Sequence, residues 1–520
     1  MSRAKVELFR RKFRNAIELL SDHLAKADDA EFLQMAWAVD TLQSSIGGDV
    51  NRYLEHPSEA KTTDIAAQYY VYKWDIETLV MLLLTIPKHD QKNASRRLNC
   101  GHFGAMALVV NLLRSAENYE SGIRLDGSNI FAELHRIGQR QFGWQRGFAT
   151  TERLYRYAYV YAQGDCEKFF KDKNGISVSD FILGCFVLFV HHRKVPWVKA
   201  TPLSFLNKPQ EIIDKTLAVI AREIPALRES ALDMLPAERR IAYLPSVLRR
   251  FPVVIHPRLG TYIAPLPELI MLRATVGLYY DVALGSSALV NEANQRFEEY
   301  TRLLIVNLCP RFEALPAIRY GSKKASYDSP DVLLKDADKL VAVIECKATK
   351  LTHKAQFAED PIAEAQGAYD QIVKAIFQLW RFFSHVRRGL FRGYELAPEA
   401  HAIVLTLDSW MQMAPGLRTE ALSRASTLAD TDGNITQEDR RPVIFCSIQD
   451  LADTLVLSTE DDLLDAFARS TTTEHSGWTL REVRREGRKP EEAKNLTLDF
   501  SQLLPWWTDI QERQKARNRD

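Results

Sequence analysis

The stretch SPDVLLKDADKLVAVIECK, residues 329–347, determines the fold that we predict for the second half of this 520-residue chain. Residues 331–334 and 340–347 are mostly apolar and partly β-branched, as strands inside a sheet tend to be. The polar run at 335–339 is short enough for a hairpin turn. The stretch therefore predicts two strands paired through a hairpin.

Charged side chains stand at one end of this predicted hairpin. Because side chains alternate between the faces of a strand, Glu345 and Lys347 project to one side, and Cys346 projects to the opposite, buried side. Asp331 begins the partner strand, so the hairpin can bring its carboxylate near Glu345. Charged groups at the end of an apolar strand need partners or a metal ion.

Two adjacent carboxylates and an amine suggest a particular chemistry. Carboxylates held side by side repel each other and suit a hard divalent cation such as Mg²⁺, for which Mn²⁺ can substitute. Such an ion lowers the pKa of a bound water and stabilises charge on a phosphate. Lys347 can position that water, help to deprotonate it, or neutralise charge in the transition state. The pattern predicts a hydrolytic site for a phosphodiester.

The hairpin lies in a series of predicted helices and strands. Helices are expected at 288–308 and 361–388, with further strands at 317–320, 402–407 and 443–446. Helices are also expected at 460–468 and 479–485, the latter with Ser476 as a possible cap. This order predicts an α/β domain at 286–510 with a mixed sheet flanked by helices, followed by a charged tail at 511–520.

Pro330-Asp331, followed after a hairpin by Glu345-Cys346-Lys347, resembles the PD-(D/E)XK nuclease superfamily, which has the restriction-endonuclease-like fold. The resemblance covers about residues 286–410. It implies that Asp331 and Glu345 bind the metal, that the Cys346 carbonyl is a third ligand, and that Lys347 is the catalytic lysine. It also implies an acidic residue on the preceding helix and a glutamine on the following one, for which the candidates are Glu298, then Glu299, and Gln378, with Gln371 as the alternative.

Residues 1–285 are predicted to be mostly helical. Helical segments are expected at 9–20, 69–84, 103–113, 154–170, 177–191 and 209–222, with short strands at 253–256 and 261–264. Breaks at 120–122 and 126–128 suggest two subdomains divided near 120–150. No motif in this region indicates a chemistry, so substrate binding, sensing and partner binding all remain open as its role.

Charge is distributed locally. The net charge of +1 means that any nucleic-acid contact must come from local basic patches. Candidate phosphate contacts lie on and just after the helix at 361–388: Lys374, Arg381, Arg387 and Arg388. The alternative is that these cations complement the carboxyl end of the helix dipole. The basic segment near the start of the chain is interpreted as a solvated amphipathic helix.

Cysteine use and hydropathy suggest a cytoplasmic protein. The six cysteines are dispersed and form no metal-binding spacing, as expected for buried thiols in a reducing compartment. No signal peptide is apparent, and the most apolar run, 181–190, is too short to span a bilayer. No membrane partner is therefore expected.

Together these features predict a Mg²⁺-dependent endonuclease that cleaves DNA in preference to RNA. A nuclease domain joined to a long helical module is similar in architecture to bacterial defence and mobile-element nucleases. One alternative is a nucleic-acid-binding or scaffold protein that keeps this fold without cutting. Another is a toxin or effector nuclease controlled by a protein partner on the helical half, and self-association is also open.

Overall fold

The computed structural model of the chain divides into two compact units. Unit 1 comprises Met1–Ile130, Arg140–Gly285 and Phe500–Asp520, and unit 2 comprises Phe131–Gln139 and Ser286–Asp499. The structure describes residues 3–45, 48–88, 97–125, 130–141, 150–199, 201–236, 240–256, 258–283, 285–323, 325–348, 350–351, 353–358, 360–408, 415–488 and 492–517.

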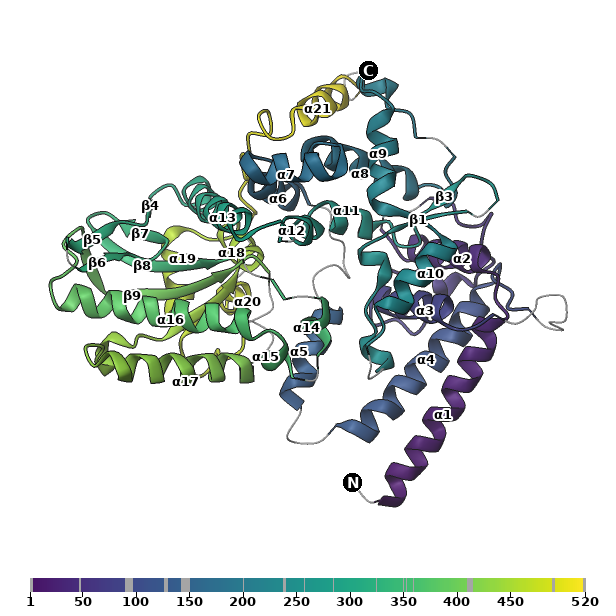
Figure 1. Cartoon of the computed structure of the whole chain (residues 1–520), viewed down its shortest axis with the longest axis horizontal. Helices are drawn as coiled ribbons and strands as arrows, with labels where there is room; N and C mark the ends of the chain where they lie inside the picture. The colour runs from purple at the N-terminus through teal and green to yellow at the C-terminus, as the bar shows by residue number, and fades with distance from the viewer. Residues whose placement is uncertain are drawn as a thin grey trace. The chain divides into compact units, whose positions relative to one another are not determined.

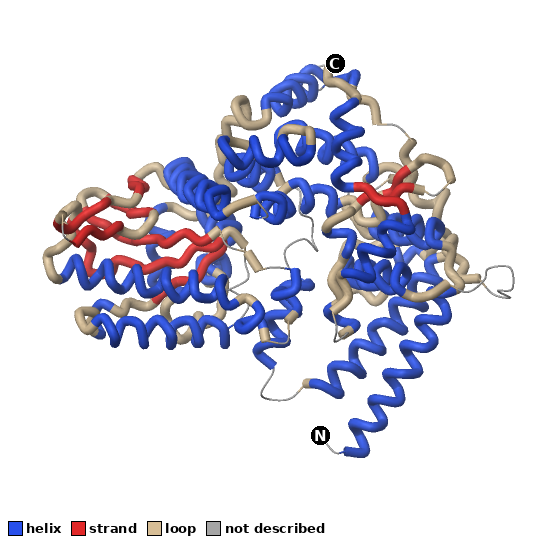
Figure 2. The backbone as a smooth tube through the Cα atoms, in the orientation of Figure 1, coloured by secondary structure: helices blue, strands red, loops and turns tan. Residues whose placement is uncertain are grey.

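Unit 1 is mostly helical, and its described strands form one small sheet in the order β1-β2-β3 (Figure 2). The strands are β1 (Ala221–Glu223), β2 (Val253–Ile255) and β3 (Tyr262–Ile263). The helices are α1 (Arg3–Ala25), α2 (Asp29–Leu42), α3 (Lys73–Thr85), α4 (Phe103–Arg124), α6 (Thr151–Tyr161), α7 (Gly164–Asn174), α8 (Val178–His192), α9 (Glu211–Ile220), α10 (Ile224–Asp233), α11 (Glu268–Ala274), α12 (Val276–Ala283) and α21 (Pro505–Arg517), and α5 (Ile130–Gln141) is shared between the units.

The break that we predicted at 120–122 is wrong, because α4 continues to Arg124. Gly122 instead allows a close approach of α1: a Cβ atom at this position would lie 2.4 Å from the Phe9 ring. A glycine in a helix can thus serve helix packing rather than helix termination. The second predicted break, at 126–128, lies outside the described residues.

Two other predicted helices of unit 1 end earlier than expected. The segment 154–170 forms two helices, α6 and α7, because α6 ends at Tyr161. The segment 209–222 ends as a helix at Ile220, and its last residues join β1, which pairs in parallel with β2. The sequence pattern did not reveal this third strand because three residues are too few to show a period.

The apolar run at 181–190 lies within α8, where Phe181, Leu183 and Leu188 are buried. Within the described ranges, we find no single helix with the length and apolarity needed to cross a membrane, although the bent pair of α7 and α8 meets those criteria jointly.

The segment 500–510 belongs to unit 1 rather than to the C-terminal domain in which we placed it. Trp506 is buried beside the Phe186 ring and donates its indole N–H to the Ser179 carbonyl at 3.1 Å. These contacts pack the Trp506 side chain onto the body of unit 1. Most of the charged tail predicted from residue 511 is helical, because α21 continues to Arg517.

Unit 2 contains a mixed five-stranded sheet in the order β10-β9-β8-β7-β4. β8, β9 and β10 run parallel to one another, and β7 is antiparallel to both β8 and β4. The strands are β4 (Glu313–Pro316), β7 (Val332–Asp336), β8 (Lys339–Lys347), β9 (Glu395–Thr406) and β10 (Val443–Ser447).

Helices cover both faces of this sheet. α16 packs on β8 and β9, and α17 packs on the outer side of α16 (Figure 1). α13 covers the other face, where the Cys346 thiol approaches the Thr301 hydroxyl at 3.9 Å. The helices of this unit are α13 (Ser287–Leu308), α14 (His353–Phe357), α15 (Pro361–Glu364), α16 (Gln366–Arg387), α17 (Pro415–Asp432), α18 (Ile448–Leu455), α19 (Glu460–Ser470) and α20 (Leu480–Arg485). The predicted mixed sheet flanked by helices is confirmed at this level.

Local details of unit 2 differ from our predictions. The strand predicted at 317–320 is confirmed only in its second half, which begins β5 (Arg319–Ser322). This strand forms a separate hairpin with β6 (Ala325–Asp328), and the edge strand of the main sheet, β4, ends earlier, at Pro316. The helix predicted at 361–388 is divided at Ala365. Thr479, not Ser476, caps α20.

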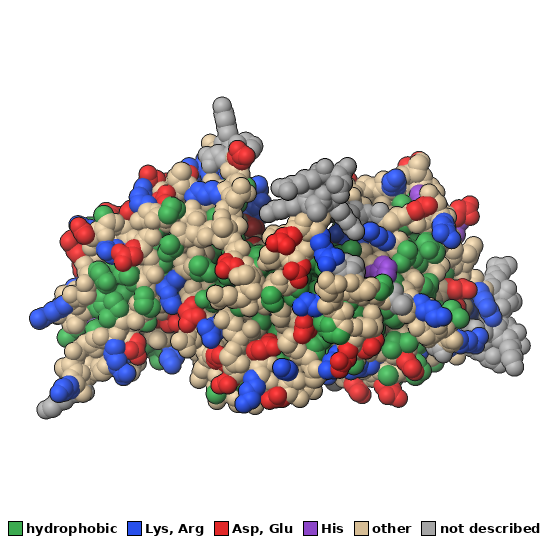
Figure 3. All heavy atoms as spheres, turned by 90° about the horizontal axis from the view of Figure 1, so that it is seen from above, with side chains coloured by type: hydrophobic (Ala, Val, Ile, Leu, Met, Phe, Trp, Pro, Cys, Tyr) green, Lys and Arg blue, Asp and Glu red, His purple; other side chains and the backbone are tan. Residues whose placement is uncertain are grey.

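The surface mixes charges of both signs. On the face drawn in Figure 3, cationic and anionic side chains lie interspersed among apolar ones. This arrangement agrees with the formal net charge of +1.

Candidate active site

The hairpin of β7 and β8 places the predicted carboxylates opposite each other. Val332 pairs with Ile344, so the next residues outward, Asp331 and Glu345, are cross-strand neighbours. The tight turn between the strands contains Ala337, whose φ of 50° lies in the left-handed region. The register therefore brings two acidic side chains to one face of the sheet, as the alternation of side chains predicted.

A backbone hydrogen bond fixes the position of Asp331. The Cys346 N–H donates to Asp331 Oδ2 at 2.7 Å. Pro330, which precedes Asp331, has no N–H to offer to the strand ladder. The Pro330 carbonyl accepts from the Ser329 hydroxyl, and the Asp331 side chain is the acceptor for the Cys346 N–H, which orients the Asp331 carboxylate along the end of β8.

Lys347 completes the cluster. Its Nζ donates to Glu345 Oε2 at 2.9 Å and lies 3.8 Å from Asp331 Oδ2. The exposed fractions of the side chains are 2% for Glu345, 15% for Lys347 and 21% for Asp331. We name this group the carboxylate–lysine cluster. It opens toward solvent on the Asp331 side and is closed around Glu345.

Burial and mutual repulsion control protonation in this cluster. Burial of Glu345, together with the nearby charge of Asp331, raises the pKa of Glu345 from 4.5 to about 8. Burial opposes the charged form of Lys347, but the two carboxylates outweigh this effect and raise the pKa of Lys347. Without a cation, Glu345 is therefore largely protonated at neutral pH, whereas Lys347 is charged.

The other predicted metal ligands lie nearby but in different arrangements. Burial first, and then the charge of Asp331, raise the pKa of Glu298 from 4.5 to about 7, so this α13 carboxyl is electrostatically coupled to the cluster. Glu299 forms an ion pair with Arg296 at 3.2 Å instead. The Cys346 side chain points to the opposite face, so only its main-chain carbonyl could serve as a ligand.

The donor set suits only a cation that needs few protein ligands. Within the described ranges, no three His, Cys, Asp or Glu side chains are grouped as a metal site. Asp331 and Glu345 supply two carboxylates on one face. Mg²⁺ commonly binds through one or two carboxylates and retains several waters. The pair therefore fits Mg²⁺ or Mn²⁺ and lacks the donors of a closed zinc site.

The two predicted glutamines are not joined to the cluster by any contact that the described part of the chain shows. α16 connects the parallel strands β8 and β9, so it must run back from their carboxyl ends. Gln371 therefore lies nearer than Gln378 to the edge that carries Lys347, by about 10 Å along the helix axis. Gln371 is exposed and Gln378 is half-buried.

The four cations predicted to contact phosphate have different surroundings on and just after α16. Arg387 binds Asp439 through two hydrogen bonds, of 2.9 and 2.8 Å, which gives Arg387 a structural role. Arg381 stacks over the rings of Tyr327 and Phe377.

Lys374 and Arg388 are exposed. Because α16 runs away from the carboxyl ends of the strands, Arg387 and Arg388 lie at the opposite edge of the sheet from the cluster. Of the four cations, Lys374 is therefore the one nearest to the level of the cluster.

One ion pair beside the cluster escaped the sequence analysis. Lys350 lies three residues after Lys347, and its Nζ is 3.0 Å from Asp408 Oδ2. Asp408 follows Thr406, which is paired with Lys347 in the β8–β9 register. The pair joins the loops after two parallel strands, at the edge where ligand sites of such sheets lie. The position of Lys350 and Asp408 just after two predicted strands was the sequence feature that could have indicated this ion pair.

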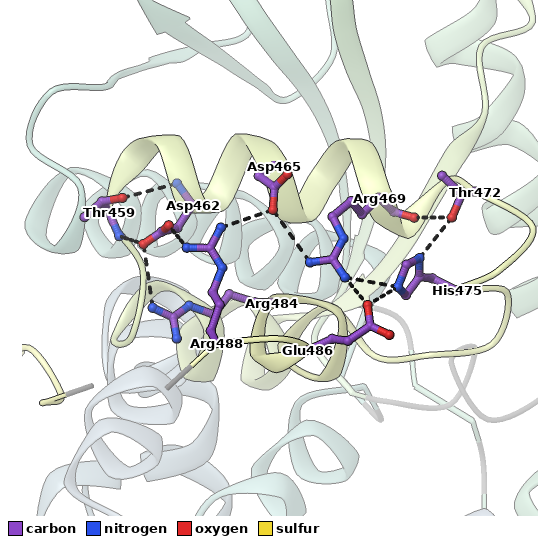
Figure 4. A network of polar contacts seen from close by, with 9 residues as sticks. All are labelled: Thr459, Asp462, Asp465, Arg469, Thr472, His475, Arg484, Glu486 and Arg488. Carbon is purple, nitrogen blue, oxygen red and sulfur yellow. Dashed lines mark hydrogen bonds and ion pairs between the residues drawn. The ribbon is translucent and has the colours of Figure 1, made fainter. Parts of the chain in front are cut away.

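A second polar network, on α19 and α20, has residue types that could suggest catalysis (Figure 4). His475 Nδ1 lies 3.0 Å from the Thr472 hydroxyl, and His475 Nε2 lies 2.6 Å from Glu486 Oε2. However, the Thr472 hydroxyl donates to the Arg469 carbonyl at 2.8 Å. Because its proton is directed to the main chain, this hydroxyl is not an activated nucleophile, and the network is assigned a structural role.

Comparison with known proteins gives no family assignment: no family model matches the chain, and no curated protein or solved structure matches it significantly. The functional argument therefore depends on the geometry of the cluster.

Proposed function

We propose that unit 2 is a Mg²⁺-dependent phosphodiesterase of the restriction-endonuclease-like class, acting on DNA. The observation that carries the proposal is the convergence of Asp331, Glu345 and Lys347 at adjacent strand ends. Their spacing resembles the PD-(D/E)XK motif, and the mixed sheet between α13 and α16 is the setting in which that motif occurs. DNA is preferred to RNA as substrate on this resemblance alone.

The charge balance of the cluster favours cation binding over a structural ion pair. A structural pair needs one carboxylate for each ammonium, whereas here Asp331 and Glu345 share Lys347. The second carboxylate is ionised only against burial and repulsion, which is why the pKa of Glu345 is raised to about 8. A divalent cation would take the place of the Glu345 proton and allow both carboxylates to be ionised together.

The residues of the cluster have distinct roles in the proposed reaction. Asp331 and Glu345 would hold the cation, and the Cys346 N–H keeps Asp331 oriented toward it. A bound Mg²⁺ supplies Lewis-acid stabilisation of the phosphate and a water of lowered pKa. Lys347, held between the carboxylates, would position the attacking water and neutralise negative charge as the phosphorus–oxygen bond breaks.

The test is incubation with linear duplex, circular duplex, single-stranded DNA and RNA, each with Mg²⁺, with Mn²⁺ and with chelator. The wild type should cut DNA only with a cation, and Lys347→Met should lose at least about a hundredfold in rate. Lys335→Met is the matched control, since Lys335 is at the other end of β7 and pairs with Glu313 near the surface. Cleavage by Lys347→Met at the wild-type rate, or cleavage in chelator, would contradict the proposed mechanism.

The same experiment separates cleavage from mere binding. A non-cutting scaffold would bind nucleic acid and leave every substrate intact with either cation. A partner-controlled effector would stay inactive alone and become active when its partner is added or removed. Metal-dependent cutting by the purified chain would exclude the non-cutting scaffold. It would also show that no protein partner is needed for activity.

A further inference from the structure

α1 carries a concentration of positive charge that differs from the rest of the chain. Residues 3–14 contain six Lys and Arg side chains and one acidic side chain, Glu7, a net charge of +5. The whole chain has a net charge of +1, so the remaining residues carry a net charge of −4. We name this segment the basic arm; its cations are Arg3, Lys5, Arg10, Arg11, Lys12 and Arg14.

The cations of the basic arm are exposed along its whole length. Glu7 lies 3.6 Å from Arg10 and 4.0 Å from Arg14, and all three side chains are at least 59% exposed. Ion pairs this open to solvent contribute little and are easily exchanged for another anion. The positive charge is therefore available to a partner in solution.

The main apolar contacts of the same helix are made within unit 1. Phe9 packs against the Tyr119 ring and into the space above Gly122 of α4, and Leu20 and Leu24 are buried. A helix that binds a membrane surface needs a free apolar face to insert. In the basic arm Phe9 packs on α4 and Leu8 is 38% exposed, and a single exposed leucine does not make such a face. The chemistry of the arm therefore suits a polyanion bound from water.

Resting on the proposed phosphodiesterase function, we infer that the basic arm is a second, sequence-independent contact for the phosphate backbone of a nucleic-acid duplex. The arm is about 17 Å long, a length over which duplex DNA presents about ten phosphate charges. Arg3, Arg10 and Arg14 are spaced seven and four residues apart and share one side of the helix. The contact retains substrate on the chain and reads no bases.

The test measures the salt dependence of binding to a labelled duplex in chelator, so that cleavage does not intervene. The variant Arg3→Gln/Arg10→Gln/Arg14→Gln should reduce the slope of log affinity against log salt by about 2 to 3. At physiological salt its dissociation constant should rise at least about tenfold. The Arg→Lys variant at the same three positions should keep most of the slope, since charge rather than shape makes the contact.

The matched control removes the same charge from another helix of unit 1. The variant Lys168→Gln/Lys171→Gln/Lys173→Gln changes three exposed cations of α7, which are interleaved with carboxylates of that helix. This control should leave the slope unchanged. An unchanged slope in the arginine variant overturns the inference, and so does an equal loss in the control, which would indicate a response to net charge alone.

Two further outcomes separate this inference from its rival and from the proposed function. If the arginine variant loses binding to phosphatidylserine vesicles while duplex binding is unchanged, the arm is a membrane contact and the inference is overturned. If the wild type shows the expected slope, the variant loses it, and neither cuts DNA with Mg²⁺, the inference is supported while the proposed function fails.

Discussion

Replacing Glu345 with Gln should flatten the pH dependence of stability in the cation-free protein. The folded-state pKa of Glu345 is about 8, against 4.5 for the ordinary side chain. Between these values the native state binds more protons than the unfolded state, so stability falls as pH rises. The contribution is complete below pH 4.5 and lost as pH rises through about 8. Gln keeps the shape of the protonated acid and cannot ionise.

The size of the effect follows from the displacement of the pKa. A displacement from 4.5 to about 8 corresponds to at most about 5 kcal/mol. Entry of water and movement of Lys347 reduce the energy of ionising Glu345, so we expect the wild type to lose about 2 to 4 kcal/mol relative to Glu345→Gln across this range.

The assay is urea denaturation in chelator from pH 5 to 8.5, with the unfolding free energy compared between the two proteins at each pH. Glu299→Gln is the control, because Glu299 is paired with Arg296 and lies outside the cluster. Parallel pH profiles for wild type and Glu345→Gln would refute the reasoning, since they would mean that Glu345 ionises in the fold as readily as in water.

Adding a cation should narrow the stability difference between the two proteins at pH 8. Mn²⁺ at ten times its dissociation constant should stabilise the wild type by about 1.4 kcal/mol at pH 8. Glu345→Gln has one carboxylate fewer and should gain much less. Equal stabilisation of both proteins would place the cation elsewhere.

Three other substitutions test the roles of single contacts. Arg387→Gln should lower the denaturation midpoint by removing the two hydrogen bonds that Arg387 donates to Asp439, while duplex affinity stays unchanged; weaker binding at unchanged stability would restore Arg387 as a phosphate contact. Lys350→Met should reduce stability by about 1 to 3 kcal/mol and slow any cleavage, because the buried ion pair between the two loops is lost; full stability would show that the pair does not join the two loops. Trp506→Ala should reduce stability by about 3 to 5 kcal/mol in urea titrations, and a loss below about 1 kcal/mol would mean that α21 docks without it.

The elements that sequence predicts well are those whose signal is local. The hairpin of β7 and β8 was predictable because its strands are apolar and the turn between them is polar. The projection of Glu345 and Lys347 to the same face of the sheet was predictable because side chains of a strand alternate with a two-residue period. The helix at 288–308 was found to within one residue, since its apolar face is long enough to show a period.

The features that sequence missed depend on partners far away in the chain. Gly122 looks like a helix breaker until Phe9 is known to lie against it. The sequence around Arg387 gives no sign of its partner Asp439, which lies 52 residues later in the chain. Spacing along the chain carries no information on such pairings, because they are set by how helices and loops pack.

The burial of Glu345 is predictable in part from local sequence and in part only from packing, and it connects the fold to the proposed chemistry. Strand alternation predicts the face on which Glu345 lies, but only the packing of α16 on β8 shows that this face is covered. An apolar residue at this position would make the sheet more stable, since a buried acid must be either protonated or paired. Local and global preferences conflict at position 345, and such conflicts in folded proteins concentrate at functional sites. The conflict is resolved if the carboxylate is ionised by a cation shared with Asp331, with Lys347 retained for the reaction.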